Sequence, residues 1–251
     1  MRTRSPASST PTRVLVWNEH RAERADADVA AIYPEGMHGA IAAGLRSLLP
    51  GAEVGTATLD DAGHGLTALA ETDVLVWWGH RAHDELPHEL ALAVRDAVSC
   101  GMGFVALHSS HLARPFVQLM GTSCALRWRE SDDREHVWCV SPGHPIFAGV
   151  PQPLVLERHE MYGEPFVVPP PDELVGVSWF SGGEVFRSVA VWSRGAGKVA
   201  YVSPGHETYP IYHAPAVQRL VANAVDYVAP RAGRVDLLAS PETPRALGDP
   251  A

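Results

Sequence analysis

Four short apolar runs in the sequence are each followed, within a few residues, by a histidine. The runs cover residues 13–17, 74–78, 103–107 and 198–202, and the histidines are His20, His80, His108 and His206. Runs without a polar residue at every second position are typical of strands buried on both faces of a parallel sheet. Because open α/β sheets bind ligands at the carboxyl ends of their strands, the pattern predicts that these imidazoles converge on one cleft.

Segments with helical spacing alternate with these runs. Helices are predicted at 36–49, 64–70, 87–100, 112–120 and 215–228. Residues 52–58 predict a further strand, whereas 18–35 predict a long polar loop of the kind that serves or covers a site. Alternation of strand and helix predicts a parallel sheet with right-handed crossovers.

The pattern changes after Gly121, where Pro and Gly separate short extended runs. Strands are predicted at 137–140, 154–156, 174–179 and 185–192, with a hairpin turn at 180–184. These runs predict antiparallel additions to a central, mostly parallel sheet that is flanked by helices. No linker divides the chain, so we expect one α/β domain at 13–230 between a flexible N-terminus (1–12) and a poorly packed C-terminal extension (231–251).

Composition excludes several classes of partner. The formal net charge is −9 and the pI is about 5.8, which argues against a nucleic-acid partner and against an anionic membrane surface. The first residues lack the apolar core of a secretory signal, and no apolar run is long enough to span a bilayer, so a cytoplasmic location is expected. The three cysteines, none in a CxxC pair, are expected to be buried, reduced thiols.

Residues 106–110 place His108 where a buried strand meets a helix, with small residues on either side. This is the pattern of a nucleophile elbow, which raises one side chain above the sheet. An imidazole there can act as a general acid or base or as a metal ligand; the alternative is a histidine satisfied by a backbone carbonyl. Ser109 is an alternative catalytic residue, although serine is also a common helix cap.

Two HxxH pairs, His80 with His83 and His108 with His111, follow neighbouring predicted strands. The spacing of three is compatible with a shared ion, so a divalent metal such as zinc is a candidate cofactor, held by His80, His108 and His206. A nucleotide cofactor is not expected.

The remaining candidates are carboxylates and aromatic residues. His206 and Glu207 are adjacent after a strand, which suits an oriented acid–base pair, the alternative being a turn in which Glu207 faces solvent. The acid-rich segment 157–164, with Glu160, could supply a base or a ligand, but a solvated charged loop accounts for it equally well. Aromatic faces beside polar groups suit a sugar, and the candidates are Trp78, Trp128, Tyr162 and Tyr209, although most such aromatics belong to a core.

Several phrases together resemble the trehalose-utilisation (ThuA-like) family over residues 13–230. They are Val16-Trp17-Asn18-Glu19, Tyr33-Pro34-Glu35-Gly36-Met37-His38, Trp77-Trp78-Gly79-His80, Leu107-His108-Ser109-Ser110-His111, Leu119-Met120-Gly121-Thr122, Trp128-Arg129-Glu130, Gly143-His144-Pro145-Ile146, Glu160-Met161-Tyr162-Gly163-Glu164 and Pro204-Gly205-His206-Glu207-Thr208-Tyr209-Pro210. The resemblance implies a flavodoxin-like fold of the class I glutamine amidotransferase type. In amidotransferases the elbow carries a catalytic cysteine, whereas here it carries His108, so glutamine hydrolysis through a thioester is not expected.

The resemblance also implies an enzyme acting on trehalose-type disaccharides or their 3-keto derivatives, of the isomerase, lyase or hydrolase type. We expect His108, His206, Glu207 and Glu160 to be catalytic, and Glu19, His83, Ser109 and His111 to join the four aromatic candidates in binding substrate. The alternative is a non-catalytic sugar-binding or accessory protein of the same pathway. The small-molecule sugar is the expected partner, and edge strands leave a homo-oligomer open.

Overall fold

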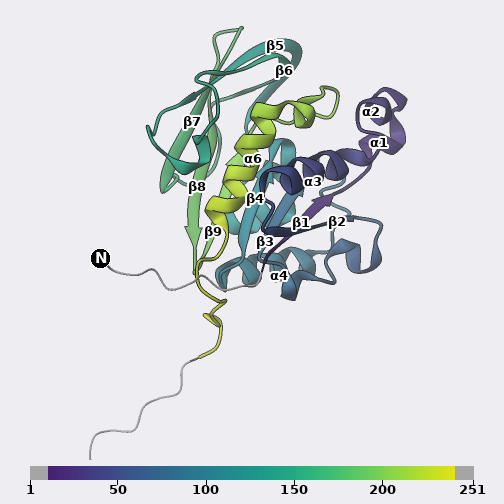
Figure 1. Cartoon of the computed structure of the whole chain (residues 1–251), viewed down its shortest axis with the longest axis vertical. Coiled ribbons are helices and arrows are strands. Elements are labelled where there is room, and N and C mark those ends of the chain that lie inside the picture. Colours follow the sequence, from purple (N-terminus) through teal and green to yellow (C-terminus); the bar gives the residue numbers. More distant parts are fainter. Residues whose placement is uncertain (1–10, 241–251) are drawn as a thin grey trace, which may run out of the picture.

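The computed structural model describes residues 11–240, and within this range the strands form one mixed sheet of nine strands with helices on both faces (Figure 1). The order across the sheet is β2-β1-β3-β4-β9-β8-β7-β5-β6. The strands are β1 (Thr12–Asn18), β2 (Ala52–Thr58), β3 (Val74–Trp78), β4 (Gly103–Leu107), β5 (Arg127–Cys139), β6 (Leu154–Gly163), β7 (Glu173–Phe180), β8 (Val185–Arg194) and β9 (Gly197–Val202). Strands β2, β1, β3, β4 and β9 pair in parallel, in that order across the sheet. The pairs that involve β8, β7, β5 and β6 are antiparallel, which confirms the predicted architecture.

Helices cover both faces of the parallel half. They are α1 (Ala22–Ala25), α2 (Ala27–Ile32), α3 (Gly36–Leu48), α4 (His88–Ser99), α5 (Arg114–Met120) and α6 (Pro215–Val228). On β3, Val74, Val76 and Trp78 belong to the core that includes α3 and α6, whereas Leu75 and Trp77 belong to the core that includes α4 and α5. Each residue of the strand is therefore buried, as the unbroken apolar run predicted.

Four of the parallel strands end level with one another. Asn18 pairs with Trp78, Trp78 with Leu107, and Leu107 with Val202. The residues that follow these four therefore emerge at the same edge of the sheet, and this shared register determines where a site can form.

The antiparallel half contains longer strands than expected. β5 begins ten residues before the predicted run at 137–140, and β6 extends through the acid-rich segment 157–164 up to Gly163. The interpretation of that segment as a solvated loop is wrong, because several of its polar side chains are buried. The apolar pattern did not predict the full length of these strands, because they are held by pairing between β5 and β6 and not by an alternation of apolar and polar residues.

Two expectations for the N-terminal half are also corrected. Residues 18–35 are not a plain loop, because α1 and α2 lie within them, and the Asp26 side chain caps α2 by accepting a hydrogen bond from the Asp28 N–H. The predicted helix at 64–70 is replaced by two 3₁₀ turns, because His64 adopts a positive φ of 53° that an α-helix does not accommodate.

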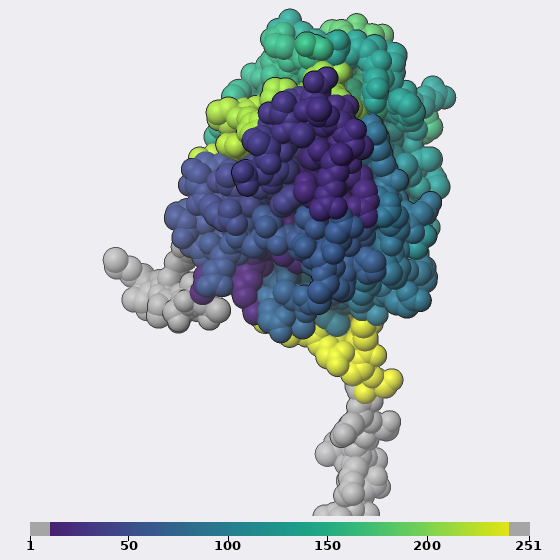
Figure 2. Space-filling view, turned by 90° about the vertical axis from the view of Figure 1, so that its right-hand side faces the viewer, coloured from purple at the N-terminus to yellow at the C-terminus, as the bar shows by residue number. Residues whose placement is uncertain are grey.

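Residues 231–240 are exposed except for the half-buried Arg234, and the Val235 N–H donates to the carbonyl oxygen of Cys100. Residues 1–10 and 241–251, which hold most of the two predicted flexible ends, lie outside the described residues. Figure 2 shows the first half of the chain, purple to blue, over most of one side, with the antiparallel half in teal and green above it. Within the described range no helix is long and apolar enough to cross a membrane.

The cysteines depart in part from expectation. Cys100, Cys124 and Cys139 are all free, but only Cys124 is buried, whereas the other two are half-buried. Cys100 directly follows α4 and Cys139 is the last residue of β5, and both positions are at the margins of the core rather than inside it.

Candidate functional site

His108 is the residue that the strand-to-helix turn after β4 raises above the sheet. Its φ is 51°, an uncommon value for a residue other than glycine. The surrounding contacts hold this conformation, because the His108 carbonyl accepts a hydrogen bond of 2.9 Å from the Tyr201 hydroxyl and its ring Nδ1 lies 2.8 Å from the Ser203 carbonyl oxygen. The geometry is that of the predicted elbow.

The contact with Ser203 determines which ring nitrogen of His108 carries hydrogen. A carbonyl oxygen only accepts, so Nδ1 donates and Nε2 bears a lone pair in the neutral ring. Burial, followed by the neighbouring His159, holds the pKa of the His108 imidazole well below its usual value. Nε2 lies 3.2 Å from the Tyr162 hydroxyl, which can donate to it, and 2.9 Å from Glu160 Oε2, which cannot when ionised.

The His206 imidazole lies beside this pair, on the segment that follows β9. Its Nδ1 is 2.8 Å from the Thr208 hydroxyl, and its Nε2 is 3.2 Å from Glu130 Oε1 and 3.9 Å from Glu160 Oε2. Burial, together with the nearby His108, lowers the pKa of His206 to about 3. His206 is therefore a neutral imidazole at physiological pH, as a metal ligand must be.

His80 completes the group from the end of β3. Its Nδ1 is 3.4 Å from Oε2 of Glu207, a fully buried carboxylate. Burial raises the pKa of Glu207, against the opposing effect of His80. Arg81 reaches the other oxygen of the same carboxylate at 3.5 Å.

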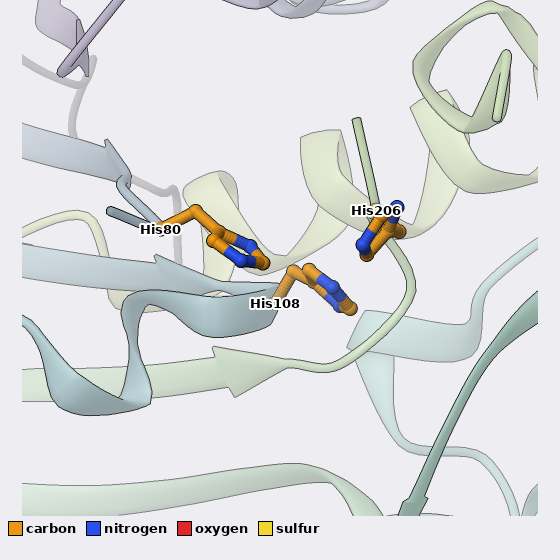
Figure 3. Close-up of side chains that lie close together, drawn as sticks. All are labelled: His80, His108 and His206. Atoms are coloured by element: carbon orange, nitrogen blue, oxygen red, sulfur yellow. The ribbon is translucent and has the colours of Figure 1, made fainter. Parts of the chain in front are cut away.

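The three histidines point toward one another from three separate segments of the chain (Figure 3). One nitrogen from each of His80, His108 and His206 lies within 4.8 Å of the others, and Glu130 and Glu160 form an overlapping group with His206. Oε2 of Glu160, Oε2 of Glu207 and Nδ1 of His80 are buried without a hydrogen-bond partner.

These atoms fit a divalent cation. Glu160 Oε2 and Glu207 Oε2 are buried acceptors without a donor, which is costly unless a positive charge lies beside them. In His206 the Thr208 N–H donates to Nδ1 at 3.2 Å, so an ion at Nε2 would require the other tautomer, in which Nδ1 donates to the Thr208 hydroxyl. Nitrogen and carboxylate oxygen donors suit zinc and other first-row divalent metals. Proximity of the three predicted ligands is thus a property of the fold, and metal occupancy is a proposal tested below.

A cavity of about 280 Å³ reaches this cluster at His80, Glu130 and Glu160, whereas the predicted catalytic residues His108, His206 and Glu207 are buried and do not line it. Among the predicted site residues, it is lined by His80, Ser109, His111, Trp128, Glu160 and Tyr162. A larger groove of about 850 Å³ adjoins it, and Leu126 and Trp128 line both. Trp128 is 64% exposed, so its indole is available to a ligand.

Other predicted substrate-binding residues lie away from that cavity. Trp78 is fully buried and donates from Nε1 to the carbonyl oxygen of Gly205. Glu19 and His83 line a separate closed crevice. Tyr209 packs its ring 5.6 Å from that of His206.

Sequence reasoning missed three polar residues around the cluster. Glu130 lines the cavity, whereas Glu135 and His159 are fully buried behind it. Glu130 belonged to a family phrase, which was a usable signal, but the other two lie on strands that the apolar pattern truncated or missed.

The fold, with its elbow after β4, is of the class I glutamine amidotransferase-like type. A solved glutamine amidotransferase from Thermotoga maritima is similar in structure, with a TM-score of 0.51, 13% identity, and coverage of 86% of this chain and 97% of that one. The model of the ThuA family, described as trehalose utilisation, matches residues 13–228, so the chain belongs to this family.

Solved ThuA-like proteins share this fold. One from Bacteroides uniformis is 17% identical, with a TM-score of 0.59 and coverage of 90% of this chain and 94% of that one. Another from Parabacteroides merdae is 14% identical, with a TM-score of 0.60 and coverage of 94% of both chains. No match was found among curated proteins.

Proposed function

We propose that this chain is an enzyme that acts on trehalose-type disaccharides or their 3-keto derivatives through histidine–glutamate acid–base chemistry, assisted by a divalent metal such as zinc. Membership of the trehalose-utilisation family supports the substrate class. The observation that carries the chemistry is the 2.9 Å approach of His108 Nε2 to Glu160 Oε2. Two lone pairs at this distance in a buried site require a proton or a metal ion near them.

The cavities support a neutral, two-ring ligand. The inner one, of about 280 Å³, lies near the lower limit for small-molecule pockets, roughly 300 Å³, and suits one sugar ring. The adjoining groove offers room for a second ring beside Trp128. Its charged lining residues are two cationic and two anionic, which favours a neutral, hydroxyl-rich ligand: Arg127, Arg129, Glu164 and Glu184.

The residues around the inner cavity suit proton transfer next to a ketone. The C–H bond beside the carbonyl of a keto sugar is acidified, and the Glu160 carboxylate, which lines the cavity, takes that proton. Burial raises the pKa of the Tyr162 hydroxyl well above its usual value, so this group keeps its proton and can donate a hydrogen bond to a developing oxyanion. A metal held by His80, His108 and His206 would supply further stabilisation of negative charge on oxygen.

Proton transfer can be tested without knowing the final product. A 3-keto disaccharide is incubated with the wild-type protein in D₂O, and proton NMR follows loss of the C–H signal beside the ketone. We expect exchange or turnover with the wild type and neither with Glu160→Gln, which keeps the side-chain shape but removes the base. Binding of the sugar in calorimetry, without exchange or turnover, would instead support the non-catalytic sugar-binding module.

A further inference from the structure

A second carboxylate–histidine pair lies behind the cluster, on the neighbouring antiparallel strands β5 and β6. Glu135 on β5 and His159 on β6 are both fully buried, and Oε2 of the first lies 2.7 Å from Nδ1 of the second. The Ser178 hydroxyl donates to the other oxygen of Glu135. Neither member of the pair lines the cavity, so contact with substrate does not explain why a polar pair is buried here.

The outer nitrogen of the His159 ring binds main chain. Its Nε2 accepts a hydrogen bond of 3.0 Å from the Gly205 N–H and a longer one of 3.3 Å from the His206 N–H. An N–H group only donates, so Nε2 must bear a lone pair and Nδ1 must carry the hydrogen, and this nitrogen lies 2.7 Å from the negatively charged Glu135 Oε2. The carboxylate therefore fixes the tautomer of His159 that can hold these two amides.

The segment that His159 holds is also fixed from its other side. The Gly205 carbonyl accepts a hydrogen bond of 3.0 Å from Trp78 Nε1. A Cβ added to Gly205 would lie 2.0 Å from the Tyr212 hydroxyl oxygen, so the backbone passes too close to this side chain for any residue other than glycine. The main chain at His206 is thus held on both sides.

We infer that Glu135 and His159 are a positioning pair that sets the main chain at residues 205–206 and thereby the place of the His206 imidazole beside His108. The pair acts through Gly205 and His206 and touches no reacting atom. Its value to catalysis rests on the proposed function, whereas the hydrogen-bond arrangement itself does not.

The wild-type protein provides the first test. Nitrogen-15 NMR of the histidine rings at neutral pH should show His159 with hydrogen on Nδ1 and a lone pair on Nε2. Hydrogen on Nε2, alone or together with Nδ1, would overturn the inference, and this measurement needs no variant to fold.

Matched variants provide the second test. His159→Phe keeps the ring volume but removes the acceptor, whereas His159→Gln can place its side-chain oxygen where Nε2 lay. We expect hydrogen exchange at the Gly205 and His206 amides to accelerate at least tenfold in the Phe variant and to recover in the Gln variant. Co²⁺ affinity, followed by visible absorption, should fall by roughly tenfold to a hundredfold in the Phe variant, as for other residues that orient ligands.

These outcomes separate the two proposals. Unchanged amide exchange and unchanged Co²⁺ affinity in a folded Phe variant would contradict the positioning role. Absence of Co²⁺ binding by the wild type, with the expected tautomer and amide protection, would refute the metal in the proposed function while the positioning pair stands. If the Phe variant does not fold, Glu135→Leu takes its place. Without the carboxylate, hydrogen can move from Nδ1 to Nε2 of His159, which should accelerate hydrogen exchange at the same two amides.

Discussion

Glu19 accepts the backbone N–H of Arg81 through one carboxylate oxygen, at 2.8 Å. Its second oxygen accepts the N–H of Ala82 at 2.9 Å, and the side chain is almost completely buried. The segment after β1 therefore fixes the segment after β3, which carries His80. Glu19 acts on the site through the main chain and not by lining the cavity, which differs from the substrate-binding role expected for it.

Replacement of Glu19 by Gln should destabilise the protein. The Gln side chain offers one acceptor, so its amide group would face a backbone N–H and leave one buried donor unpaired. We expect the free energy of unfolding to fall by about 1–3 kcal/mol, measured by urea denaturation. Glu85→Gln is the matched control, because Glu85 pairs with Arg21 at the exposed surface, and its loss should cost less than about 1 kcal/mol. Equal effects of the two changes would contradict the role assigned to Glu19.

His108→Asn should separate the chemistry of the elbow from its structure. Asn tolerates positive φ, and its amide can donate to the Ser203 carbonyl as the ring Nδ1 does, but it has no counterpart of Nε2. We expect turnover or deuterium exchange to fall at least about a hundredfold, with the melting temperature close to that of the wild type. Retained activity in a folded variant would remove His108 from the mechanism.

Metal content tests the proposed ligands directly. Protein purified without chelator should contain close to one divalent ion per chain by elemental analysis, and His80→Ala or His206→Ala should lose most of it. His88→Ala is the control, because His88 is exposed at the start of α4, away from the cluster. A chelator should lower the melting temperature of the wild type, since an ion that binds only the folded state stabilises it. Equal metal content in all four proteins would exclude this site as the one occupied.

Stability should fall as pH falls below about 6.5. Burial lowers the pKa of His111 to about 4, whereas an unfolded histidine titrates near 6.5. Between these values the unfolded chain binds more protons than the folded one, so the free energy of unfolding rises with pH, by about 1.4 kcal/mol per pH unit for this one group. His111→Asn can keep the donor to the Cys124 carbonyl, and it should flatten this slope. An unchanged slope in that variant would show that His111 does not supply it.

Trp128→Ala should distinguish disaccharides from single sugars. The indole lines both cavities, so its loss should raise KM or Kd for a two-ring ligand roughly tenfold, equivalent to about 1.4 kcal/mol, and affect a one-ring ligand less. Trp138→Ala is the control, since Trp138 lies on the same strand and is 48% exposed but lines neither cavity. Equal effects of Trp128→Ala on both ligands would show that the second sugar ring does not bind beside Trp128.

Much of the fold follows from local pattern. The apolar runs that became β1, β3, β4 and β9 are buried on both faces, and α3, α4, α5 and α6 begin and end within two residues of their expected positions. The elbow was also visible, because small residues around His108 are a local signal. These features depend on neighbours in sequence, which is the information that periodicity and turn residues contain.

The antiparallel half of the sheet was less predictable from the sequence. Glu160, Glu135 and His159 are polar residues that face buried partners, so they interrupt the apolar pattern of the strands that carry them. Their partners lie far away along the chain, and only the register between β5 and β6 determines which of them meet. A solvated loop and a buried strand with polar side chains have the same local composition here.

The sequence by itself determined the class of fold and the end of each parallel strand, because these depend on which positions must avoid water, and its short motifs indicated the family. The strand ends predicted that His80, His108 and His206 are neighbours, but only the tertiary structure decided that His20 packs against His38 instead of joining them, and which carboxylates face the cluster. The reason is physical: a hydrogen bond or a shared cation requires atoms within a few ångströms of one another, and long-range strand pairing, not spacing along the chain, sets that distance.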